Sequence, residues 1–225
     1  MIAYLIIKKH SERVPEKNFR ELGGKLLFRW ILDTLQEVVE LERIVINTDA
    51  RDRLATLGLV ESERLVLRDR QEDLHGDDIT ANTLIAADLN EIEGEEWLMT
   101  HVTNPFLSAE TIRSGIARYR ECVDDGSADS LFGVNRVSRR LYGVDGDAIN
   151  HDPKKLIPTQ DLPPVYEENS CLYIFSKASF RATGARIGLK PLLFEMPRLE
   201  SLDIDDMEDW RLAEMMTTAR KGNNR

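Results

Sequence analysis

Short apolar runs alternate along this chain with longer segments in which apolar residues recur every three or four positions. The short runs are typical of buried β-strands and the longer segments of amphipathic helices, so the alternation predicts an α/β fold. We expect a mostly parallel sheet with helices on both faces, which binds its ligand beyond the carboxyl ends of the strands. The expected strands are Ala3–Ile7, Arg43–Asn47, Leu65–Leu67, Trp97–Val102, Leu131–Val137, Cys171–Phe175 and Ser201–Ile204.

The clearest helical patterns lie at residues 27–38 and 84–92, where the apolar side chains fall on one face. Ser108 is expected to cap another helix, because a serine oxygen accepts a hydrogen bond from the free N–H groups of a first turn. Acidic residues at 206–209 precede a further helical stripe that includes Trp210, and we expect them to stabilise the N-terminal dipole of that helix.

Composition limits the domain count and the class of partner. The chain has 225 residues, 42% of them hydrophobic, and a formal net charge of −10. This length and apolar content predict a single domain spanning residues 1–225. The acidic balance argues against a nucleic-acid partner, which requires a broad positive surface. No apolar run approaches the roughly 20 residues of a membrane span, and the two isolated cysteines indicate reduced thiols, so we expect a cytoplasmic protein with no membrane partner.

One segment, at about 139–165, interrupts the alternation. It carries several prolines, which disfavour regular helix, and the dipeptide Asp145-Gly146, which is typical of tight hairpin turns. We therefore predict an inserted hairpin and loop within the domain. Its apolar side chains exceed what so small a lobe can bury. They are Leu141, Tyr142, Val144 and Ile149.

The first expected strand is followed by a basic loop, KKHSERVPEKN at residues 8–18. In an open α/β sheet such a loop lies at the ligand-binding edge, where its donors suit phosphate oxygens. The glycines of a P-loop or a dinucleotide fingerprint are missing, so side chains would supply the donors. A polyphosphate ligand is one interpretation, and a solvated loop paired with Glu12 and Glu16 is the other. The donors are Lys8, Lys9, Ser11, Arg13, Lys17 and Asn18.

An acidic segment, LDID at residues 202–205, carries Asp203 and Asp205 at alternate positions. In a strand, both carboxylates would point to one side and the two apolar residues to the other. Carboxylates on one face repel each other unless a cation lies between them, and Mg²⁺ takes such ligands together with water and phosphate oxygens. We interpret the pair as a magnesium site, with plain solvated surface as the alternative.

Several segments of the chain resemble, in the same order, the sequence motifs of one known family. The first is SERVPEKNFRELGGKLL, which covers most of the basic loop and the residues after it. The others are INTDARD (46–52), RQEDLHGDD (70–78), THVTNPF (100–106), TQDLPPVYEENSCLYIF (159–175) and LDIDDMEDW (202–210). The chain thus resembles the acylneuraminate cytidylyltransferase (CMP-sialic acid synthetase) family over nearly its whole length.

This resemblance implies a Rossmann-like nucleotidyltransferase fold, in which the inserted hairpin packs across a two-fold axis in a homodimer. It also implies an activity, the transfer of CMP from CTP to the anomeric hydroxyl of an acidic 2-keto sugar, with release of pyrophosphate. The acceptor would be acylneuraminate-like or octulosonate-like, and the product would serve surface-polysaccharide synthesis. The implied ligands are CTP, the sugar acid and Mg²⁺ as cofactor.

The same resemblance implies roles for individual residues, each read from a matching motif. Lys8, Ser11, Arg13 and Lys17 would hold the phosphates and act in catalysis. Asn18, Arg70, Thr80 and Asn82 would bind the nucleotide. His101, Thr103, Asn104, Gln160, Tyr166 and Asn169 would bind the sugar, and Asp203 and Asp205 would hold Mg²⁺.

The chain departs from the family pattern at several positions. Lys8, Lys9 and His10 precede the loop serine, where the family has an arginine and two glycines. Pro158 stands where an arginine commonly meets the sugar carboxylate, so we expect a sugar acid other than N-acetylneuraminate. The group that takes the hydroxyl proton is left open between His101 and a metal-bound hydroxide. These departures also leave a second interpretation open. In it, the chain is a non-catalytic relative that binds a nucleotide or a sugar acid and acts as an interaction subunit.

Overall fold

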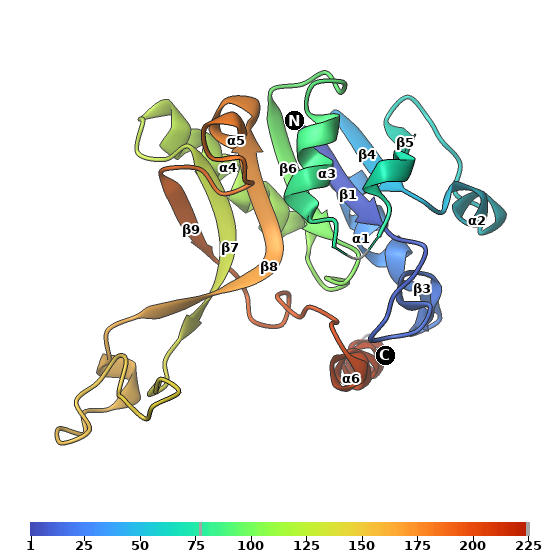
Figure 1. The fold of residues 1–225 in the computed structure, drawn as a ribbon. Coiled ribbons are helices and arrows are strands. Elements are labelled where there is room, and N and C mark those ends of the chain that lie inside the picture. Colours follow the sequence, from blue (N-terminus) through green and yellow to red (C-terminus); the bar gives the residue numbers. More distant parts are fainter. Residues whose placement is uncertain (77, 224–225) are drawn as a thin grey trace.

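The computed structural model describes residues 1–76 and 78–223 and centres on a mixed seven-stranded sheet (Figure 1). Its strands are β1 (Ile2–Ile7), β4 (Arg43–Thr48), β5 (Leu65–Asp69), β6 (Glu96–His101), β7 (Ser130–Val137), β8 (Val165–Ser176) and β9 (Pro191–Glu195). They lie in the order β5-β4-β1-β6-β8-β7-β9. The first four of these run parallel, while β8 is antiparallel to both of its neighbours. The carboxyl ends of β1, β4 and β6 therefore meet at one edge, and the predicted α/β fold is confirmed.

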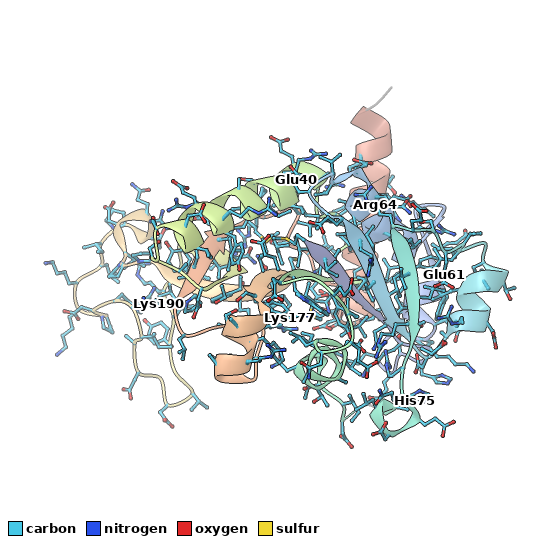
Figure 2. All side chains as sticks on the ribbon, turned by 90° about the horizontal axis from the view of Figure 1, so that it is seen from above. Glu40, Glu61, Arg64, His75, Lys177 and Lys190 are labelled. Atoms are coloured by element: carbon cyan, nitrogen blue, oxygen red, sulfur yellow. The ribbon has the colours of Figure 1, made fainter. Side chains whose placement is uncertain are left out.

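Helices cover both faces of the sheet, as the sequence predicts (Figure 2). One face carries α1 (Leu27–Glu37), α2 (Arg51–Thr56), α4 (Ala109–Asp124) and α6 (Met207–Asn223). The other carries α3 (Ala81–Asp88) and α5 (Lys177–Thr183). Ser108 caps α4 by accepting a hydrogen bond from Thr111 N at 3.1 Å, which confirms that prediction. Throughout the described range, no helix has both the length and the apolarity that a membrane crossing requires.

The sheet divides the hydrophobic core into two clusters, and β1 contributes to both. Ala3, Leu5 and Ile7 point into the cluster beneath α1 and α4. Ile2 and Tyr4 point into the cluster beneath α3 and α5. This alternation follows from the two-residue period of a strand, and burial on both sides explains why β1 is an uninterrupted apolar run. The core thus fixes the strand whose end leads into the basic loop.

One expected strand is wrong. Residues Ser201–Ile204 have no regular secondary structure, and within the described residues they join no sheet. Ile204 N donates to Thr103 O at 2.9 Å, so the segment crosses the end of β6 and does not extend the sheet. The edge strand is instead β9, which the sequence did not indicate. Its side chains alternate only between half-buried and exposed, so its apolar pattern is weak.

The insertion, residues 138–164, joins β7 to β8 and projects from the body of the molecule (Figure 1). Its small hairpin is confirmed, because Tyr142 and Ala148 form an antiparallel bridge. Gly146 adopts a φ of 84° in the turn, a conformation that glycine tolerates best. Val144 is fully exposed and Leu156 is 73% exposed. Apolar surface on the insertion is therefore left uncovered by this chain.

A short two-stranded hairpin, β2 (Glu21–Leu22) and β3 (Lys25–Leu26), follows the basic loop. Gly23 and Gly24 form its turn, with φ values of 62° and 87°. A Cβ on Gly23 would lie 2.9 Å from Thr217 Cβ of α6, so glycine also allows the hairpin to approach that helix. The segment that follows the basic loop is thereby packed against α6.

Candidate functional site

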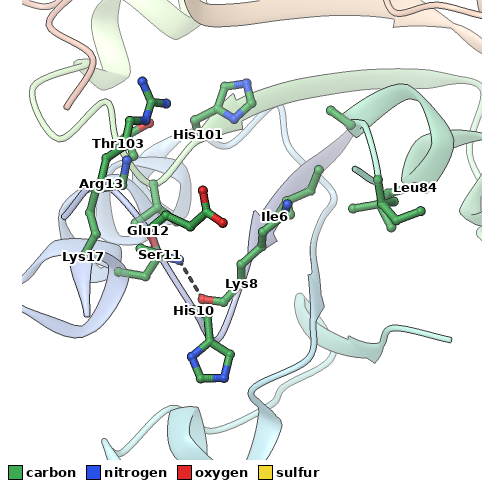
Figure 3. Close-up of a pocket in the computed structure, with 14 residues that line it drawn as sticks. Ile6, Lys8, His10, Ser11, Glu12, Arg13, Lys17, Leu84, His101 and Thr103 are labelled. Carbon is green, nitrogen blue, oxygen red and sulfur yellow. Dashed lines mark hydrogen bonds between the residues drawn. The ribbon is translucent and has the colours of Figure 1, made fainter. Parts of the chain in front are cut away.

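A cavity of about 360 Å³ opens at the carboxyl ends of β1 and β6 (Figure 3). The basic loop forms one wall, the N-terminal end of α3 forms another, and the residues that follow β6 form a third. Residues predicted to bind phosphate and residues predicted to bind a sugar, which lie far apart in the sequence, therefore meet here. The predicted site residues that line the cavity are Lys8, Ser11, Arg13, Lys17, Asn18, His101 and Thr103.

Hydrogen bonds give the basic loop its shape without the glycines of a phosphate-binding nest. Asn18 Nδ2 donates to Lys8 O at 2.8 Å, the bond drawn dashed in Figure 3. Lys9 N donates to Asp49 Oδ1 at 2.7 Å, which ties the loop to the end of β4. Asn18 is buried, so its amide supports the loop from the protein side. The ammonium, guanidinium and hydroxyl groups of the loop then supply the polar lining.

Two cations of the basic loop contact the acidic segment. Arg13 Nη2 lies 2.7 Å from Asp205 Oδ1, an ion pair between residues 192 positions apart. Lys17 Nζ donates to Ile204 O at 2.7 Å. Burial lowers the pKa of Lys17, while the charges of Asp205 and Asp203 act in the opposite direction. The loop and the acidic segment therefore form one site.

Asp203 is a carboxylate that the protein leaves unsatisfied. Its Oδ1 is buried and has no hydrogen-bond partner among the described residues. Burial raises the pKa of Asp203, a hydrogen bond from Thr103 opposes the rise, and the Asp205 charge adds to it. A buried carboxylate oxygen without a donor is an atom that a divalent cation would satisfy.

The strand geometry expected for this pair is wrong, because residues 202–205 form no regular secondary structure and do not pair in a sheet. Asp203 adjoins Thr103, whereas Asp205 is half-exposed and meets Arg13. Within the described residues, no three or more His, Cys, Asp or Glu side chains gather closely enough to hold a metal by themselves. An oxygen-only pair still fits Mg²⁺, which commonly takes one or two protein carboxylates and fills its shell with water and substrate phosphate.

His101, the last residue of β6, is neutral. Burial lowers its pKa to about 3, and the charges of Arg186 and Lys17 act in the same direction. Arg186 Nη1 lies 3.5 Å from His101 Nε2. Because a guanidinium only donates, we assign Nε2 as the bare nitrogen and place the hydrogen on Nδ1. His101 is therefore a hydrogen-bond donor through Nδ1, and its accepting nitrogen is already engaged.

Arg186 is a residue of this region that sequence reasoning missed. Its guanidinium carbon lies 3.8 Å from the centre of the Tyr173 ring, and Nη2 donates to the Tyr173 hydroxyl at 3.0 Å. Its backbone N donates to Asn82 Oδ1 at 3.2 Å, so one predicted nucleotide-binding residue holds the Arg186 main chain. Arg186 lies in the loop after α5, where no motif marks it in the sequence.

The other residues predicted to bind the nucleotide lie beside the cavity. Arg70 is buried, and its Nε donates to Asn47 Oδ1 at 2.9 Å while its Nη1 lies 3.5 Å from Asp49 Oδ2. Burial lowers the pKa of Arg70, and its Nη2 has no hydrogen-bond partner among the described residues. Thr80 caps α3 with its side chain. Asp77, within the RQEDLHGDD motif, lies outside the described residues.

Four residues predicted to bind the sugar do not line the cavity. Gln160 is exposed in a 3₁₀ turn of the insertion, η3 (Thr159–Asp161), and Tyr166 is 40% exposed at the base of the insertion. Asn104 and Asn169 are buried, and the side chain of each hydrogen-bonds to a neighbouring backbone group. In this arrangement Asn104 and Asn169 bond to the backbone, Gln160 lies in the insertion and Tyr166 lies at the start of β8, and none of the four lines the cavity.

The sequence matches a family described as cytidylyltransferase over residues 8–198. This chain belongs to the cytidylyltransferase family. The matched range begins at the first residue of the basic loop and includes Arg186, and it ends before the acidic segment. The sequence resemblance to this class of enzyme is therefore confirmed at the level of the family.

Two known proteins are similar in sequence to this cytidylyltransferase over nearly all of its length. N-acylneuraminate cytidylyltransferase of Streptococcus agalactiae serotype V is 22% identical over 218 residues, which cover 93% of the chain and 51% of that protein. CMP-N,N'-diacetyllegionaminic acid synthase of Legionella pneumophila is 27% identical over 230 residues, which cover 96% of the chain and 95% of that protein. The chain thus spans about half the length of the streptococcal relative and nearly all of the Legionella one.

Solved structures share the fold of this cytidylyltransferase. The 4-diphosphocytidyl-2C-methyl-D-erythritol synthase of Anaerococcus prevotii superposes with a TM-score of 0.68 at 14% identity, covering 96% of this chain and 98% of that one. A CMP:2-keto-3-deoxy-manno-octonic acid synthetase complexed with CTP gives a TM-score of 0.64 at 10% identity, covering 97% and 98%. These likenesses confirm the predicted nucleotidyltransferase fold.

Proposed function

We propose that this cytidylyltransferase transfers CMP from CTP to the anomeric hydroxyl of an acidic 2-keto sugar and releases pyrophosphate. The observation that carries the proposal is the Arg13–Asp205 ion pair, which joins the acidic segment to the basic loop that lines the cavity. A nucleoside triphosphate with a divalent cation requires donors for its phosphate oxygens and carboxylates for the cation in the same place. The acceptor class is supported by the names of the two relatives, both of which refer to acidic sugars.

The basic loop would bind the phosphates through Lys8, Ser11, Arg13 and Lys17. Arg13 and Lys17 already donate to carboxylate and carbonyl oxygens, and the same cationic groups form charge-assisted hydrogen bonds to phosphate oxygens. Arg13 would exchange its contact with Asp205 for a phosphate oxygen when the triphosphate enters. Holding both reactants in line is the main contribution that a nucleotidyltransferase makes to the rate.

Asp203 and Asp205 would hold Mg²⁺, and the orphaned Oδ1 of Asp203 is the observation that supports this assignment. A bound Mg²⁺ would neutralise the phosphate charge that develops during transfer. Thr103 adjoins Asp203 and would keep that carboxylate oriented through its hydrogen bond. Asn18, Arg70, Thr80 and Asn82 would form the nucleotide side of the site.

In the proposed reaction, the anomeric oxygen forms a bond to the α-phosphorus while the bond from that phosphorus to the pyrophosphate oxygen breaks. The electron pair of the broken bond leaves with pyrophosphate, and the hydroxyl proton is released to solvent. His101 would not take this proton, because its Nε2 faces Arg186 and its Nδ1 carries a hydrogen. We assign it to donate a hydrogen bond to the sugar, beside Thr103.

A homodimer and a cytoplasmic location, both expected from the sequence, stay part of the proposal. The exposed apolar side chains of the insertion support the dimer, since they have no cover within this chain. A sugar acid other than N-acetylneuraminate also stays part of it, because Pro158 occupies the position of the usual arginine. Supply of an activated sugar for surface-polysaccharide synthesis would be the role of the product.

A non-catalytic subunit that binds a nucleotide or a sugar acid is the second candidate. The observation that favours it is the replacement of the loop glycines by Lys9 and His10, which leaves fewer backbone donors for phosphate. Against it stands Asp203, because a carboxylate oxygen that is buried without a hydrogen-bond partner is costly for a protein that binds no cation. The observations therefore favour the enzyme.

Pyrophosphate release from CTP tests the proposal directly. Purified protein is mixed with CTP, Mg²⁺ and, in separate reactions, N-acetylneuraminate, 3-deoxy-manno-octulosonate and N,N'-diacetyllegionaminate. We expect pyrophosphate and a CMP-sugar with at least one acid, and neither product when the acceptor is omitted. CTP binding without product from any of the acids would instead support the non-catalytic subunit.

A further inference from the structure

β8 changes its pairing with β7 part-way along its length. Val165–Glu168 pair with one end of β7 and Tyr173–Phe175 with the other, so residues 169–172 bulge out opposite Gly133. Ser170 in this bulge has a φ of 56°, a left-handed conformation that costs free energy for a residue with a side chain. Bulges of this kind re-aim side chains and occur often beside functional sites.

The bulge brings Glu168 and Tyr173 together. In a regular strand, residues five positions apart point to opposite faces and lie roughly 16 Å from each other. Here the Tyr173 hydroxyl donates a hydrogen bond to the Glu168 carboxylate. Gly133 permits this geometry, because a Cβ at that position would lie 2.6 Å from Asn169 Oδ1. The strained backbone therefore creates a polar cluster on one side of the sheet.

Arg186 completes the cluster from the loop after α5. Its guanidinium lies over the Tyr173 ring at 3.8 Å, and Nη2 lies 3.8 Å from Glu168 Oε1, which is too far for a hydrogen bond. The Arg186 side chain is 19% exposed, and its main chain is fixed through Asn82. The guanidinium is thus held in position by a ring face and by its own backbone.

The protein satisfies the donors of Arg186 only in part. A guanidinium carries five N–H donors. Nη1 faces Met99 Sδ at 3.7 Å and His101 Nε2 at 3.5 Å, a weak acceptor and a distant one. Among the described residues, the Tyr173 hydroxyl is the one oxygen at normal hydrogen-bond distance. A carboxylate matches the planar fork of such a guanidinium with two parallel hydrogen bonds.

We propose that Arg186 binds the carboxylate of the acceptor sugar acid, the role for which this chain has no arginine at Pro158. The inference rests on the proposed function. His101 lines the cavity and also contacts Arg186, so the guanidinium lies one side chain away from the proposed phosphate site. The carboxylate adds to the long contacts of Nη1 and Nη2, so Nη1 still faces His101 Nε2 and Glu168 keeps its hydrogen bond from Tyr173.

A purely structural arginine, stacked on Tyr173 to hold the α5 loop, is the competing explanation. It predicts that loss of Arg186 lowers the stability of the protein, or lowers turnover by the same factor for every acceptor. A carboxylate-binding arginine instead predicts that the loss falls on acceptors that carry the free acid. Comparing a sugar acid with its own methyl ester separates the two, because the ester keeps the ring and the hydroxyls but loses the negative charge.

The test uses Arg186→Gln, Arg186→Lys and the matched control Arg181→Gln, whose arginine is exposed on α5 and bonded to Asn90. KM and kcat are measured for the best acceptor of the three-acid panel and for its methyl ester, and the dissociation constant of CTP is measured by calorimetry. We expect the parent to favour acid over ester by about 10- to 100-fold, the effect of charge-assisted hydrogen bonds. Arg186→Gln should raise KM for the acid by a similar factor and abolish the preference.

The remaining readouts separate the possible outcomes. The dissociation constant of CTP should stay unchanged in all variants, Arg186→Lys should keep part of the acid preference, and Arg181→Gln should match the parent. An active parent whose acid preference survives in Arg186→Gln overturns the inference and leaves the proposed function standing. A parent that binds CTP but turns over none of the three acids overturns the proposed function, and the role of Arg186 with it.

Discussion

Lys17 Nζ donates a hydrogen bond to the main-chain oxygen of Ile204 at 2.7 Å, between the two carboxylates of the acidic segment. This contact joins the basic loop near the N-terminus to the end of the chain that enters α6. Burial lowers the pKa of Lys17, so the ammonium has lost part of its hydration before a ligand arrives. A partly desolvated cation of this kind interacts strongly with an incoming phosphate.

Replacing Lys17 with methionine should lower kcat/KM for CTP by about 100-fold or more, because it removes a charged donor from the phosphate site. Lys190→Met is the matched control, since Lys190 Nζ also donates to a backbone carbonyl but lies just before β9, an edge strand that is three strands away from β6 in the sheet. Steady-state kinetics with varied CTP measure the effect. Equal losses in the two variants would contradict the role of Lys17.

Replacing Asp203 with asparagine should remove activity and spare the fold. Loss of a ligand to Mg²⁺ is expected to lower turnover by roughly 100-fold or more. The free energy of unfolding without Mg²⁺ should not fall, because burial disfavours the charge that the substitution removes. Pyrophosphate release and urea unfolding measure the two quantities, with Asp145→Asn in the hairpin turn as the control. Full Mg²⁺-dependent turnover in Asp203→Asn would refute the metal assignment.

Much of the fold was predictable, because its signals are local. β1 is apolar on both sides since both faces of the sheet are covered, and Ser108 caps α4 through atoms only a turn away. The strand proposed at Ser201–Ile204 failed for a non-local reason. Its alternating pattern reflects Ile204 entering the core and Asp203 facing Thr103, and no neighbouring strand is involved.

In the candidate site, too, the features with local sequence signals could be predicted and the features that depend on distant parts of the chain could not. Residues of the basic loop could be placed together because one short loop carries them at the end of a strand. The contribution of Arg186 could not be predicted, since it depends on the bulge at Ser170 and on the distance between α5 and β6. Nothing near Arg186 in the sequence encodes either feature. Likewise, the displacement of Gln160 from the cavity depends on the direction of the insertion.

His101 should contribute to the loss of stability at low pH. Its pKa is about 3 in the folded protein against 6.5 for the free side chain, so between these values the unfolded chain binds a proton that the folded chain does not. Acidification through this window therefore favours unfolding. His101→Gln lacks the group and should lose less free energy of unfolding between pH 7 and about pH 4 than the parent. Urea unfolding at several pH values measures this, and parallel curves would contradict the prediction.

The exposed hairpin of the insertion should control the oligomeric state. Val144 is fully exposed and Ile149 is 61% exposed, so the described part of the chain leaves most of their surface uncovered. A small two-stranded hairpin is marginal in water, so partner packing is the expected source of its order. We expect the parent to form a dimer of this 25.7 kDa chain, with Val144 at the contact.

Val144→Asp should therefore dissociate the dimer. Burying an unpaired carboxylate in place of an apolar side chain costs several kcal/mol, so the dissociation constant should rise by about 100-fold or more. Light scattering at micromolar concentration measures the mass, with Val60→Asp as the control because Val60 is 77% exposed at a distance from the insertion. The parent and the control should both remain dimeric. A parent that is a monodisperse, active monomer would show that the exposed apolar surface of the insertion has another purpose.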